Sequence, residues 1–372
     1  MFGREDKREN KKESPEGRPD QGGVLSRWMR ENGPDGDVVL SSRVRLARNL
    51  KGIPFPRIAS EKQLEEVMDA IESATQRAPA SVGRLRVLRL DDLPGIERVA
   101  LLERHLISPM LAQNPDHRAV VLRDDEAISV MVNEEDHLRI QAMFPGLDLD
   151  EVLGLTNLVD DFYDQALDIA FSPQLGFLTA CPTNVGTGLR ASVMVHLPAL
   201  AMTGQIQKLV TASSQLGLAV RGLYGEGTEP VGSIFQISNQ LTLGRTEEQI
   251  VNHLASVTRQ VVAQEREARG RLLESSRLAV DDRVHRAYGL LANVRSVNSQ
   301  EAMVLLSDVR LGIDLGLIKD VEPTVLKDLL VAIRPATLQK LVGRSLGADE
   351  RDIERASLVR ARLAKARQQH QQ

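Results

Sequence analysis

One stretch of the chain combines a thiol, a loop of small residues and an arginine within a few positions. It covers residues 181–194 and begins with Cys181, the only cysteine among 372 residues. The proline that follows biases the cysteine toward an extended conformation. Gly186 and Gly188 allow backbone conformations that a side chain would obstruct. With Arg190 close behind, the stretch indicates an anion site with a reactive group beside it.

A simpler interpretation of this stretch is also open. A single cysteine is more often a small buried hydrophobe than a reactive group. Glycine-rich loops are common in proteins that bind no phosphate. On composition alone, the buried hydrophobe is favoured.

A second stretch, residues 38–47, reads as an apolar strand interrupted by Arg43 and Arg45. Because these arginines are two apart, a strand directs both to the same face. Like charges side by side repel unless an anion lies between them. The alternative is a solvated strand face.

The third stretch, residues 133–139, reads Asn-Glu-Glu-Asp-His-Leu-Arg. Three consecutive acids at the end of an apolar strand are costly unless they stay hydrated or bind a cation. The alternative is an acidic hairpin tip.

The elements around these stretches are expected to mix strands and helices irregularly. Hydrophobic alternation predicts strands at 38–47, 119–123, 127–132, 191–197, 218–225 and 233–240, and apolar faces predict helices at 60–76, 93–107, 148–168 and 197–216. There is no regular βαβ rhythm and no GxGxxG turn. The mixture predicts an α+β domain built on a largely antiparallel sheet.

The character of the chain changes at residue 246. Thr246-Glu-Glu-Gln249 has the form of a capping box and opens a helix expected to reach about residue 273. Further helices are expected at 279–294, 299–317, 323–342 and 348–369, with no strand candidate after about residue 245. The predicted organisation is a disordered tail at 1–23, an α+β domain at 24–268 and an all-helical domain at 269–372.

Composition limits the classes of function. The net charge of −4 and an aromatic content of 3% give no argument for nucleic acid or a membrane surface as a partner. A single cysteine excludes an internal disulfide and a cysteine-rich zinc site. The N-terminus lacks the apolar core of a signal peptide, and the chain has no run of about 18 apolar residues. A cytoplasmic location is therefore expected.

Taken together, the three stretches resemble the phosphagen kinases, the ATP:guanidino phosphotransferase family. Ser-Arg-Val-Arg at 42–45, the acidic motif at 133–139 and Cys-Pro-Thr-Asn-Val-Gly-Thr at 181–187 match the family motifs in order. Gly-Glu-Gly-Thr-Glu at 225–229 matches with one substitution. The resemblance covers about residues 38–268 and implies a glutamine-synthetase-like catalytic fold, an antiparallel sheet flanked by helices.

The activity that the resemblance implies is phosphoryl transfer from ATP to a guanidinium. A guanidinium carries only donors and is a poor nucleophile, so a carboxylate must orient it and accept its proton. The resemblance implies Glu135 as this base, Glu229 as a second clamp and Cys181 as a thiolate beside the guanidinium.

The residues that the resemblance assigns to ATP binding fall into four groups along the chain. They are Ser41, Ser42, Arg43, Val44 and Arg45; His105 and Arg139; Arg190, Ala191, Ser192, Val193 and Met194; and Arg221, Gly222, Leu223, Tyr224, Gly225 and Glu226. His105 matches a position that packs near the nucleotide base. Tyr224 stands where kinases of small substrates have another phosphate-binding arginine, with Arg221 as its candidate replacement. Mg2+ is expected to be held mainly by ATP oxygens and water, without a metal site of the protein's own.

Departures from the family pattern indicate a branch. Members that act on free creatine or arginine carry a helical domain before the first arginine motif, whereas only 41 residues precede Ser42 here. An open substrate side suits a guanidinium attached to a protein. Residues 190–194 and 221–226 resemble the bacterial protein-arginine kinase branch (McsB type), which has a C-terminal helical domain instead.

The C-terminal domain of that branch carries an Arg-Asp-x-x-Arg-Ala motif, present here as Arg351, Asp352, Arg355 and Ala356. On a helix the two arginines share a face. They can grip a phosphoryl group while the aspartate pairs with a guanidinium. Alone, such a cluster is more often a salt-bridged exposed helix; the resemblance implies an allosteric phosphoarginine pocket.

The resemblance also implies a role in the heat-shock response and protein quality control. The implied partners are protein substrates with exposed arginines, including a stress-gene repressor, a small zinc-binding activator protein and a Clp-type unfoldase, with a homodimer formed through the helical domain. Two other functions stay open. A kinase of a small guanidino compound is disfavoured by the missing N-terminal domain. A non-catalytic phosphoarginine-reading adaptor is disfavoured by the intact acids, thiol and arginines.

Overall fold

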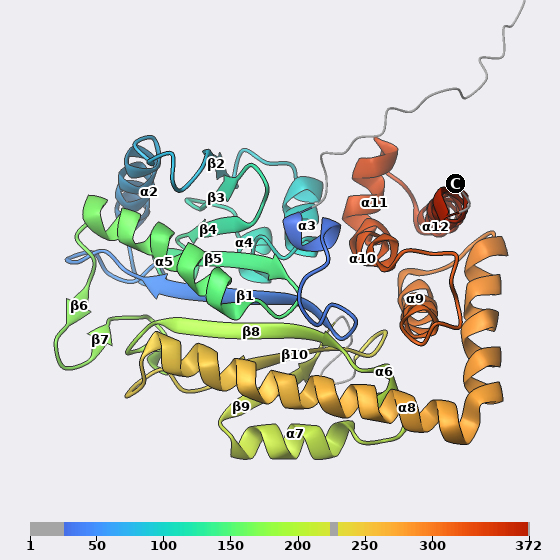
Figure 1. Ribbon diagram of the computed structural model, residues 1–372. Helices are drawn as coiled ribbons and strands as arrows, with labels where there is room; N and C mark the ends of the chain where they lie inside the picture. Colours follow the sequence, from blue (N-terminus) through green and yellow to red (C-terminus); the bar gives the residue numbers. More distant parts are fainter. Residues whose placement is uncertain (1–25, 224–229, 371–372) are drawn as a thin grey trace, which may run out of the picture.

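A central antiparallel sheet organises the computed structural model, which describes residues 26–223 and 230–370 (Figure 1). Its eight strands lie in the order β2-β3-β4-β5-β1-β8-β10-β9, and every neighbouring pair is antiparallel. The strands are β1 (Val39–Arg48), β2 (Leu85–Arg89), β3 (Ala119–Arg123), β4 (Ile128–Val132), β5 (Leu138–Pro145), β8 (Leu189–His196), β9 (Leu218–Gly222) and β10 (Ile234–Asn239). A separate hairpin pairs β6 (Phe171–Ser172) with β7 (Gly176–Phe177). The predicted α+β class is confirmed.

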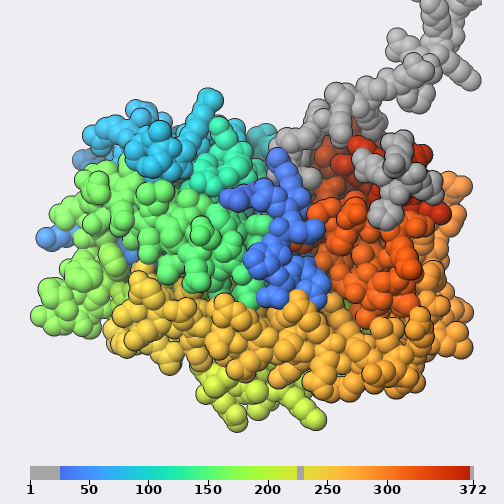
Figure 2. Space-filling view, viewed as in Figure 1, coloured from blue at the N-terminus to red at the C-terminus, as the bar shows by residue number. Residues whose placement is uncertain are grey.

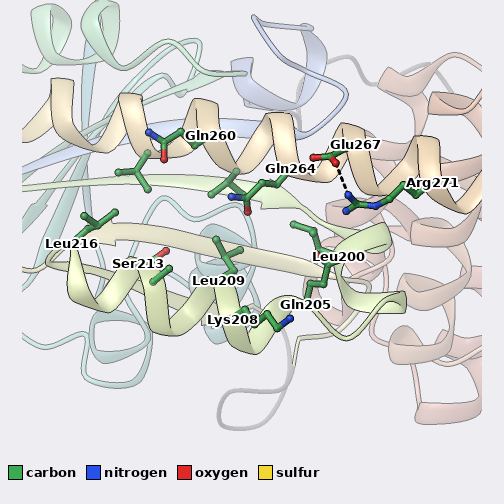
Figure 3. A pocket seen from close by; sticks show the side chains of 13 residues that line it. Leu200, Gln205, Lys208, Leu209, Ser213, Leu216, Gln260, Gln264, Glu267 and Arg271 are labelled. Atoms are coloured by element: carbon green, nitrogen blue, oxygen red, sulfur yellow. Dashed lines mark hydrogen bonds and ion pairs between the residues drawn. The ribbon is translucent and has the colours of Figure 1, made fainter.

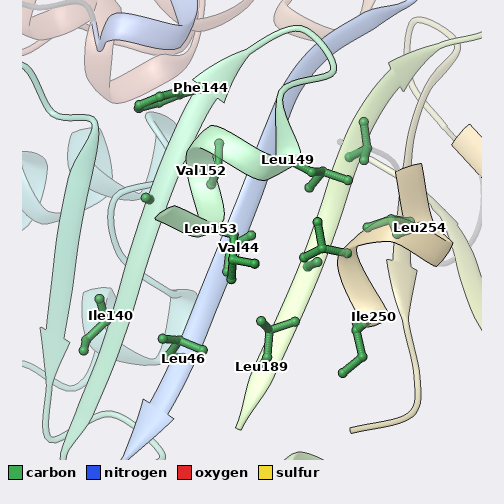
Figure 4. Packing of buried hydrophobic residues seen from close by; sticks show 14 of the residues in the cluster. Val44, Leu46, Ile140, Phe144, Leu149, Val152, Leu153, Leu189, Ile250 and Leu254 are labelled. Carbon is green, nitrogen blue, oxygen red and sulfur yellow. The ribbon is translucent and has the colours of Figure 1, made fainter. Parts of the chain in front are cut away.

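One face of the sheet packs against three helices, α2 (Glu61–Thr75), α5 (Leu149–Ala166) and the first half of α8 (Glu247–Asn293). Val44 and Leu46 of β1 point into this core beside Ile140 and Leu189 (Figure 4). Because side chains alternate along a strand, Arg43 and Arg45 of β1 must point to the opposite face. The prediction that they share a face is therefore confirmed.

The opposite face is covered at one side by two short helices, α3 (Gly95–Glu103) and α4 (Pro109–Gln113). Their apolar residues pack on β3 and β4, against Val120, Leu122 and Met131. The central strands present polar side chains on this same face.

The C-terminal part of the chain is helical and has its own core. It contains the second half of α8, α9 (Ser299–Asp314), α10 (Pro323–Ala332), α11 (Pro335–Val342) and α12 (Ala348–His370). The helix α8 belongs to both parts, with non-helical dihedral angles at Ser276 (φ −145°, ψ 31°). The predicted boundary at 268/269 falls inside α8, and the division into domains stays a prediction.

The segment around α1 (Arg27–Arg30) fills the junction between the sheet and the helical part (Figure 2). Trp28 and Met29 pack there with Met143 of β5 and Val331 of α10. Lys327 Nζ also donates a hydrogen bond to the backbone oxygen of Glu31, at 3.1 Å. The two parts are therefore joined by buried contacts as well as by the chain.

Several predicted helices were wrong in their extent. The helix expected at 197–216 is two helices, α6 (Pro198–Met202) and α7 (Ile206–Gln215), because Gly204 adopts φ +69° between them. The helix expected at 323–342 is also two, because Pro335 has no N–H to continue α10 and instead begins α11. The helices expected at 246–273 and 279–294 are both part of α8. Strands β2 and β5 were not predicted.

Within the described ranges, no helix combines the length and apolar character needed to cross a membrane.

Candidate active site

Five arginines from four strands lie on the polar face of the sheet. Arg45 of β1 stands opposite Arg190 of β8, and Arg43 stands opposite Ser192. Arg139 of β5 is one pair further along, opposite Ala47 of β1. At the other side, β10 connects the cluster to β9: Gln236 pairs with Met194 and with Arg221. Because directly opposite residues point to the same face, Arg43, Arg45, Arg139, Arg190 and Arg221 share it.

The two central arginines, Arg45 and Arg190, are surrounded by other positive charges and have donors left unsatisfied within the described part of the chain. Burial, and then the charges of Arg43, Arg139 and Arg190, hold the pKa of Arg45 well below its usual range. Burial, followed by Arg221 and Arg139, also lowers the pKa of Arg190. Neither Nε atom has a hydrogen-bond partner among the described residues. Such a cluster is costly by itself, and an anion with several oxygens would stabilise it.

Neighbouring side chains orient the outer arginines. Arg43 donates from Nη2 to Gln236 Oε1 at 2.8 Å and from Nε to Ser192 Oγ at 3.2 Å. Arg139 Nη1 lies 2.6 Å from Glu134 Oε2. The guanidinium groups are therefore held in place before any anion arrives.

The three consecutive acids have three different environments. Glu134 is buried against Arg139; burial would raise its pKa, but Arg139 together with hydrogen bonds from Ser108 and the Glu135 backbone holds it below the usual value. Asp136 is buried and accepts hydrogen bonds from Asn49 Nδ2 at 2.6 Å and Ala180 N at 2.7 Å. Glu135 is exposed. The stretch is therefore a loop fixed by buried hydrogen bonds and an ion pair rather than a solvated acidic hairpin tip. Of its three acids, only Glu135 is exposed.

The pKa of Glu135 is raised above its usual value. Partial burial is the largest cause, followed by the charges of Asp136 and Glu134, while Arg139 and a hydrogen bond with Cys181 oppose them. A carboxylate with a raised pKa is a better proton acceptor than an unperturbed one. The residue predicted as the base thus has the electrostatic environment that a base needs.

Cys181 lies beside this acid. Its backbone is extended, as predicted, with φ −93° and ψ 120°. The sulfur is 3.0 Å from Thr183 Oγ1, and the side chain is half-buried. It is therefore not the fully buried hydrophobe of the simpler interpretation.

His105 lies at the other end of the arginine cluster. It follows the end of α3 with φ +64°, and its ring centroid is 6.0 Å from that of Trp28. Burial, then the charges of Arg43 and Arg334, lower the pKa of His105 to about 3. The ring is thus neutral at ordinary pH, which suits an uncharged aromatic partner.

Comparisons with known proteins agree with this geometry. A family model described as the C-terminal catalytic domain of ATP:guanido phosphotransferases matches residues 66–268. The chain belongs to the ATP:guanido phosphotransferase family. A second model, the C-terminal domain of protein-arginine kinase McsB, matches residues 277–372.

Two bacterial relatives are similar to the chain over most of its length. A protein-arginine kinase of Halalkalibacterium halodurans is 53% identical over 91% of this chain and 96% of its own length. Another, from Desulforamulus reducens, is 52% identical over 91% of this chain and 95% of its own length. The kinase therefore belongs to the protein-arginine kinases.

Solved structures share the fold. The duplicated taurocyamine kinase of Schistosoma mansoni, with bound transition-state analogue components, is 29% identical with a TM-score of 0.55, over 62% of this chain and 33% of that chain. A lombricine kinase is 24% identical with a TM-score of 0.55, over 69% of this chain and 74% of that chain. The second similarity concerns the fold alone.

Strand alternation divides the residues of the kinase that were predicted to bind ATP. Ser42, Val44, Ala191 and Val193 point to the helix-covered face and are buried. Ser42 Oγ donates to the backbone oxygen of Gly146 at 2.7 Å, so its role is to hold a turn. These four residues cannot contact an anion on the opposite face through their side chains.

The remaining predicted residues are near the ends of the strands. Ser41 is buried on the arginine face, and Met194 and Leu223 pack against the core of the helical part. Gly222 is the last residue of β9. Tyr224, Gly225, Glu226 and Glu229 lie outside the described residues.

In the C-terminal motif of the kinase, the two arginines differ. Arg355 is 2% exposed and donates to the backbone oxygens of Ile333 at 2.8 Å and Val297 at 2.9 Å. Its Nη1 also lies 2.5 Å from Asp352 Oδ1. Arg351 is half-buried and donates to the backbone oxygen of Leu346 at 2.9 Å, and Ala356 is buried. Arg355 is therefore committed to backbone groups, whereas Arg351 is at the surface.

Two residues of the site were not predicted. Gln236 orients Arg43, and Asn49 binds Asp136. Each is a polar residue next to or within an apolar strand, and buried polar side chains require partners. That signal is visible in the sequence but does not identify the partner.

A groove of about 380 Å³ between α7 and α8 is separate from this site (Figure 3). Leu209 and Leu216 line it with Gln260 and Gln264, and none of the predicted site residues does. In the described part of the chain, no group of three or more His, Cys, Asp or Glu side chains is placed to hold a metal ion.

Proposed function

We propose that this kinase transfers the γ-phosphoryl group of ATP to arginine side chains of proteins. One observation carries the proposal: the polar face has a linear order from His105, through the arginines, to Glu135 and Cys181. Arg43 lies near His105, while Arg139 is the second residue of β5, the strand that follows Glu135. A nucleotide laid along β1 would have its base near His105, its phosphates over the arginines and its γ-phosphate near the acid.

The chemistry of transfer fits the two ends of this line. The bond between the γ-phosphorus and the bridging oxygen breaks, and ADP leaves with the electron pair. A bond forms between the phosphorus and a guanidinium nitrogen, and the proton of that nitrogen passes to the Glu135 carboxylate. The raised pKa of Glu135 favours this step, and the arginines neutralise charge around the transferred group.

Mg2+ would supply further charge neutralisation between the phosphates. We expect ATP oxygens and water to hold this ion. Glu229, the proposed second clamp, lies outside the described residues.

The acceptor side supports a protein substrate rather than a small molecule. Glu135 is exposed, and so are Pro182 and Thr183 next to Cys181. Relatives that are 50% identical or more over most of their length carry the name protein-arginine kinase. An open acceptor side admits an arginine that projects from a protein chain.

Regulation by phosphoarginine is part of the proposal. Arg351 and Asp352 are the half-buried members of the C-terminal motif, whereas Arg355 is buried and binds the backbone oxygens of Ile333 and Val297. The stress-response role, the repressor, the zinc-binding activator, the unfoldase, the homodimer and the cytoplasmic location stay predictions from the resemblance.

A competition assay tests the function. The kinase receives Mg-ATP with an unfolded arginine-rich protein and free arginine together, and the products are analysed by mass spectrometry without acid, because the N–P bond is acid-labile. We expect phosphate on protein arginine, and none when Glu135→Gln replaces the wild type. Phosphate only on free arginine would support the small-molecule kinase. Binding of phosphoarginine without any transfer, also after addition of a candidate activator protein, would support the adaptor.

A further inference from the structure

Two loops supply the chemistry at the acceptor end, and their relative position depends on one buried amide. The acid loop, residues 133–137, carries Glu135, and the thiol loop, residues 177–188, carries Cys181. We infer that Asn49 is a positioning residue for phosphoryl transfer. Its side chain fixes the position of the acid loop relative to the thiol loop. The inference rests on the proposed function where it invokes transfer, but the loop geometry stands without it.

Asn49 follows directly after β1 and is 2% exposed. Its Nδ2 donates to Asp136 Oδ1 at 2.6 Å and to the backbone oxygen of Leu178 at 3.0 Å. Its Oδ1 accepts a hydrogen bond from His137 N at 2.9 Å. One side chain therefore holds both loops, with two bonds to the acid loop and one to the thiol loop.

Asp136 completes the connection. The oxygen that binds Asn49 also accepts a hydrogen bond from Ala180 N at 2.7 Å. Asp136 is the residue after Glu135, and Ala180 is the residue before Cys181. The base and the thiol are thus each one residue away from the same carboxylate oxygen.

The far end of the thiol loop is anchored independently. Thr242 Oγ1 is 2.9 Å from the backbone oxygen of Thr183 and 2.7 Å from that of Val185. This anchor holds the thiol loop but does not reach the acid loop. Thr242 is therefore a matched control: the same loop, a similar number of bonds and no link to Glu135.

If the two loops shift relative to each other, the rate of phosphoryl transfer should fall. Misplacing a reacting group by about 1 Å can reduce a rate by about 10²-fold. The arginines proposed to hold the nucleotide belong to β1, β5, β8 and β9, whereas the side-chain hydrogen bonds of Asn49 go to the acid loop and the thiol loop. A change at Asn49 should therefore lower kcat while KM for ATP changes little.

The test uses Asn49→Asp, Asp136→Asn and the double swap. In Asn49→Asp, two carboxylates 2.6 Å apart replace a donor–acceptor pair, and like charges at this distance cannot both ionise. In Asp136→Asn, the new amide oxygen can still accept from both Asn49 Nδ2 and Ala180 N, so this variant keeps the connection and is a conservative control. In the double swap, the amide nitrogen at position 136 can donate to the carboxylate at position 49, but the bonds to Ala180 N and to the Leu178 oxygen are lost. We expect Asn49→Asp to lose about 10²-fold in kcat with KM for ATP within about twofold, Asp136→Asn to retain kcat far better, and the double swap to recover part of the loss.

The pH profile separates positioning from simple damage. The charged groups around Asp136 are Glu134, Glu135 and Arg139. In Asn49→Asp, lowering the pH protonates one of the two facing carboxyls and restores a hydrogen bond. The activity of Asn49→Asp relative to wild type should therefore rise as the pH falls. A ratio independent of pH would contradict the inference, as would a double swap no better than Asn49→Asp.

A second readout requires no activity. Because Cys181 is the only cysteine, its alkylation by iodoacetamide reports on this loop alone. We expect faster alkylation in Asn49→Asp, a rate near that of the wild type in Asp136→Asn, and an intermediate rate in the double swap. Thr242→Val should retain kcat far better than Asn49→Asp. Equal losses of kcat in Asn49→Asp and Thr242→Val, or unchanged alkylation in Asn49→Asp, would overturn the inference. If the wild type transferred no phosphate but the variants still showed these changes in alkylation, only the proposed function would be refuted.

Discussion

Glu103 binds Thr337 through two hydrogen bonds, at 2.7 Å from the backbone nitrogen and 2.8 Å from the hydroxyl oxygen. The same carboxylate accepts a third bond from Ala336 N at 3.0 Å. Glu103 ends α3 beside the sheet, and Thr337 lies in the first turn of α11 in the helical part. The carboxylate therefore satisfies the free N–H groups of a helix that belongs to the other half of the molecule.

Removing this contact should destabilise the junction. Glu103→Ala leaves buried donors without partners and should lower the free energy of unfolding by about 2–4 kcal/mol. Urea denaturation followed by the fluorescence of Trp28, the only tryptophan, measures the loss at the junction itself. Glu97→Ala is the control, because its pair with Lys340 on the same helices is partly exposed and should contribute less than about 1 kcal/mol. Equal losses in the two variants would contradict the role assigned to Glu103.

Two arginines of β1 should respond oppositely to replacement by methionine. Arg45 is surrounded by like charges, so Arg45→Met should abolish ATP binding and raise the free energy of unfolding by about 1–2 kcal/mol. Arg48 is buried 2.7 Å from Asp160 and over the ring of Phe177, so Arg48→Met should cost about 3–5 kcal/mol. Thermal unfolding without nucleotide measures both. A lower free energy of unfolding in Arg45→Met would mean that the arginine cluster is not a source of strain when no anion is bound.

The pH dependence of the reaction should report on Glu135. As a base it acts deprotonated, and its pKa is raised, so kcat/KM should fall as the pH drops through that raised pKa. The hydrogen bond with Cys181 lowers the pKa of Glu135, and its loss in Cys181→Ala should move this acid limb to higher pH. The pH profiles of wild type and Cys181→Ala test the pair directly. A limb that stays in place, or moves to lower pH, would exclude this coupling.

The two arginines of the C-terminal motif should separate regulation from folding. Arg351→Ala should keep the stability of the wild type and lose the response to phosphoarginine. Arg355→Ala should lower the free energy of unfolding by about 2–4 kcal/mol, because Ile333 and Val297 lose a charged donor to their buried carbonyl groups. Phosphoarginine titration and urea denaturation of each variant distinguish the two effects. A normal phosphoarginine response in Arg351→Ala would remove that residue from the pocket.

The sequence predicts the site most reliably where a family motif lies on a strand whose side chains alternate regularly between the two faces of the sheet. Strand alternation places Arg43 and Arg45 on one face, and the ordered motifs identify the family. The same alternation also implies that Ser42 and Val44 face the core, although both were assigned to ATP binding. The family motif marks a contiguous segment, whereas only alternate side chains of a strand reach the ligand.

Other features depend on partners far away in the chain. Asn49 and Asp136 are 87 positions apart, and Glu103 and Thr337 are 234 apart. A polar residue in an apolar context shows that a partner is needed, but the partner is chosen by the tertiary fold. The breaks at Gly204 and Pro335 were visible as residue types, yet the apolar periodicity on both sides obscured them.

The interruption of α8 at Ser276 gives the molecule a lever arm. About 17 residues separate Ser276 from Asn293, so this arm is about 26 Å long at 1.5 Å per residue. A rotation of about 5° at Ser276 would displace the tip of such an arm by about 2 Å. That tip leads into α9, while the base of the helix is fixed in the core beneath β1. A small angular change at one serine can therefore become a displacement of atomic size across the helical part.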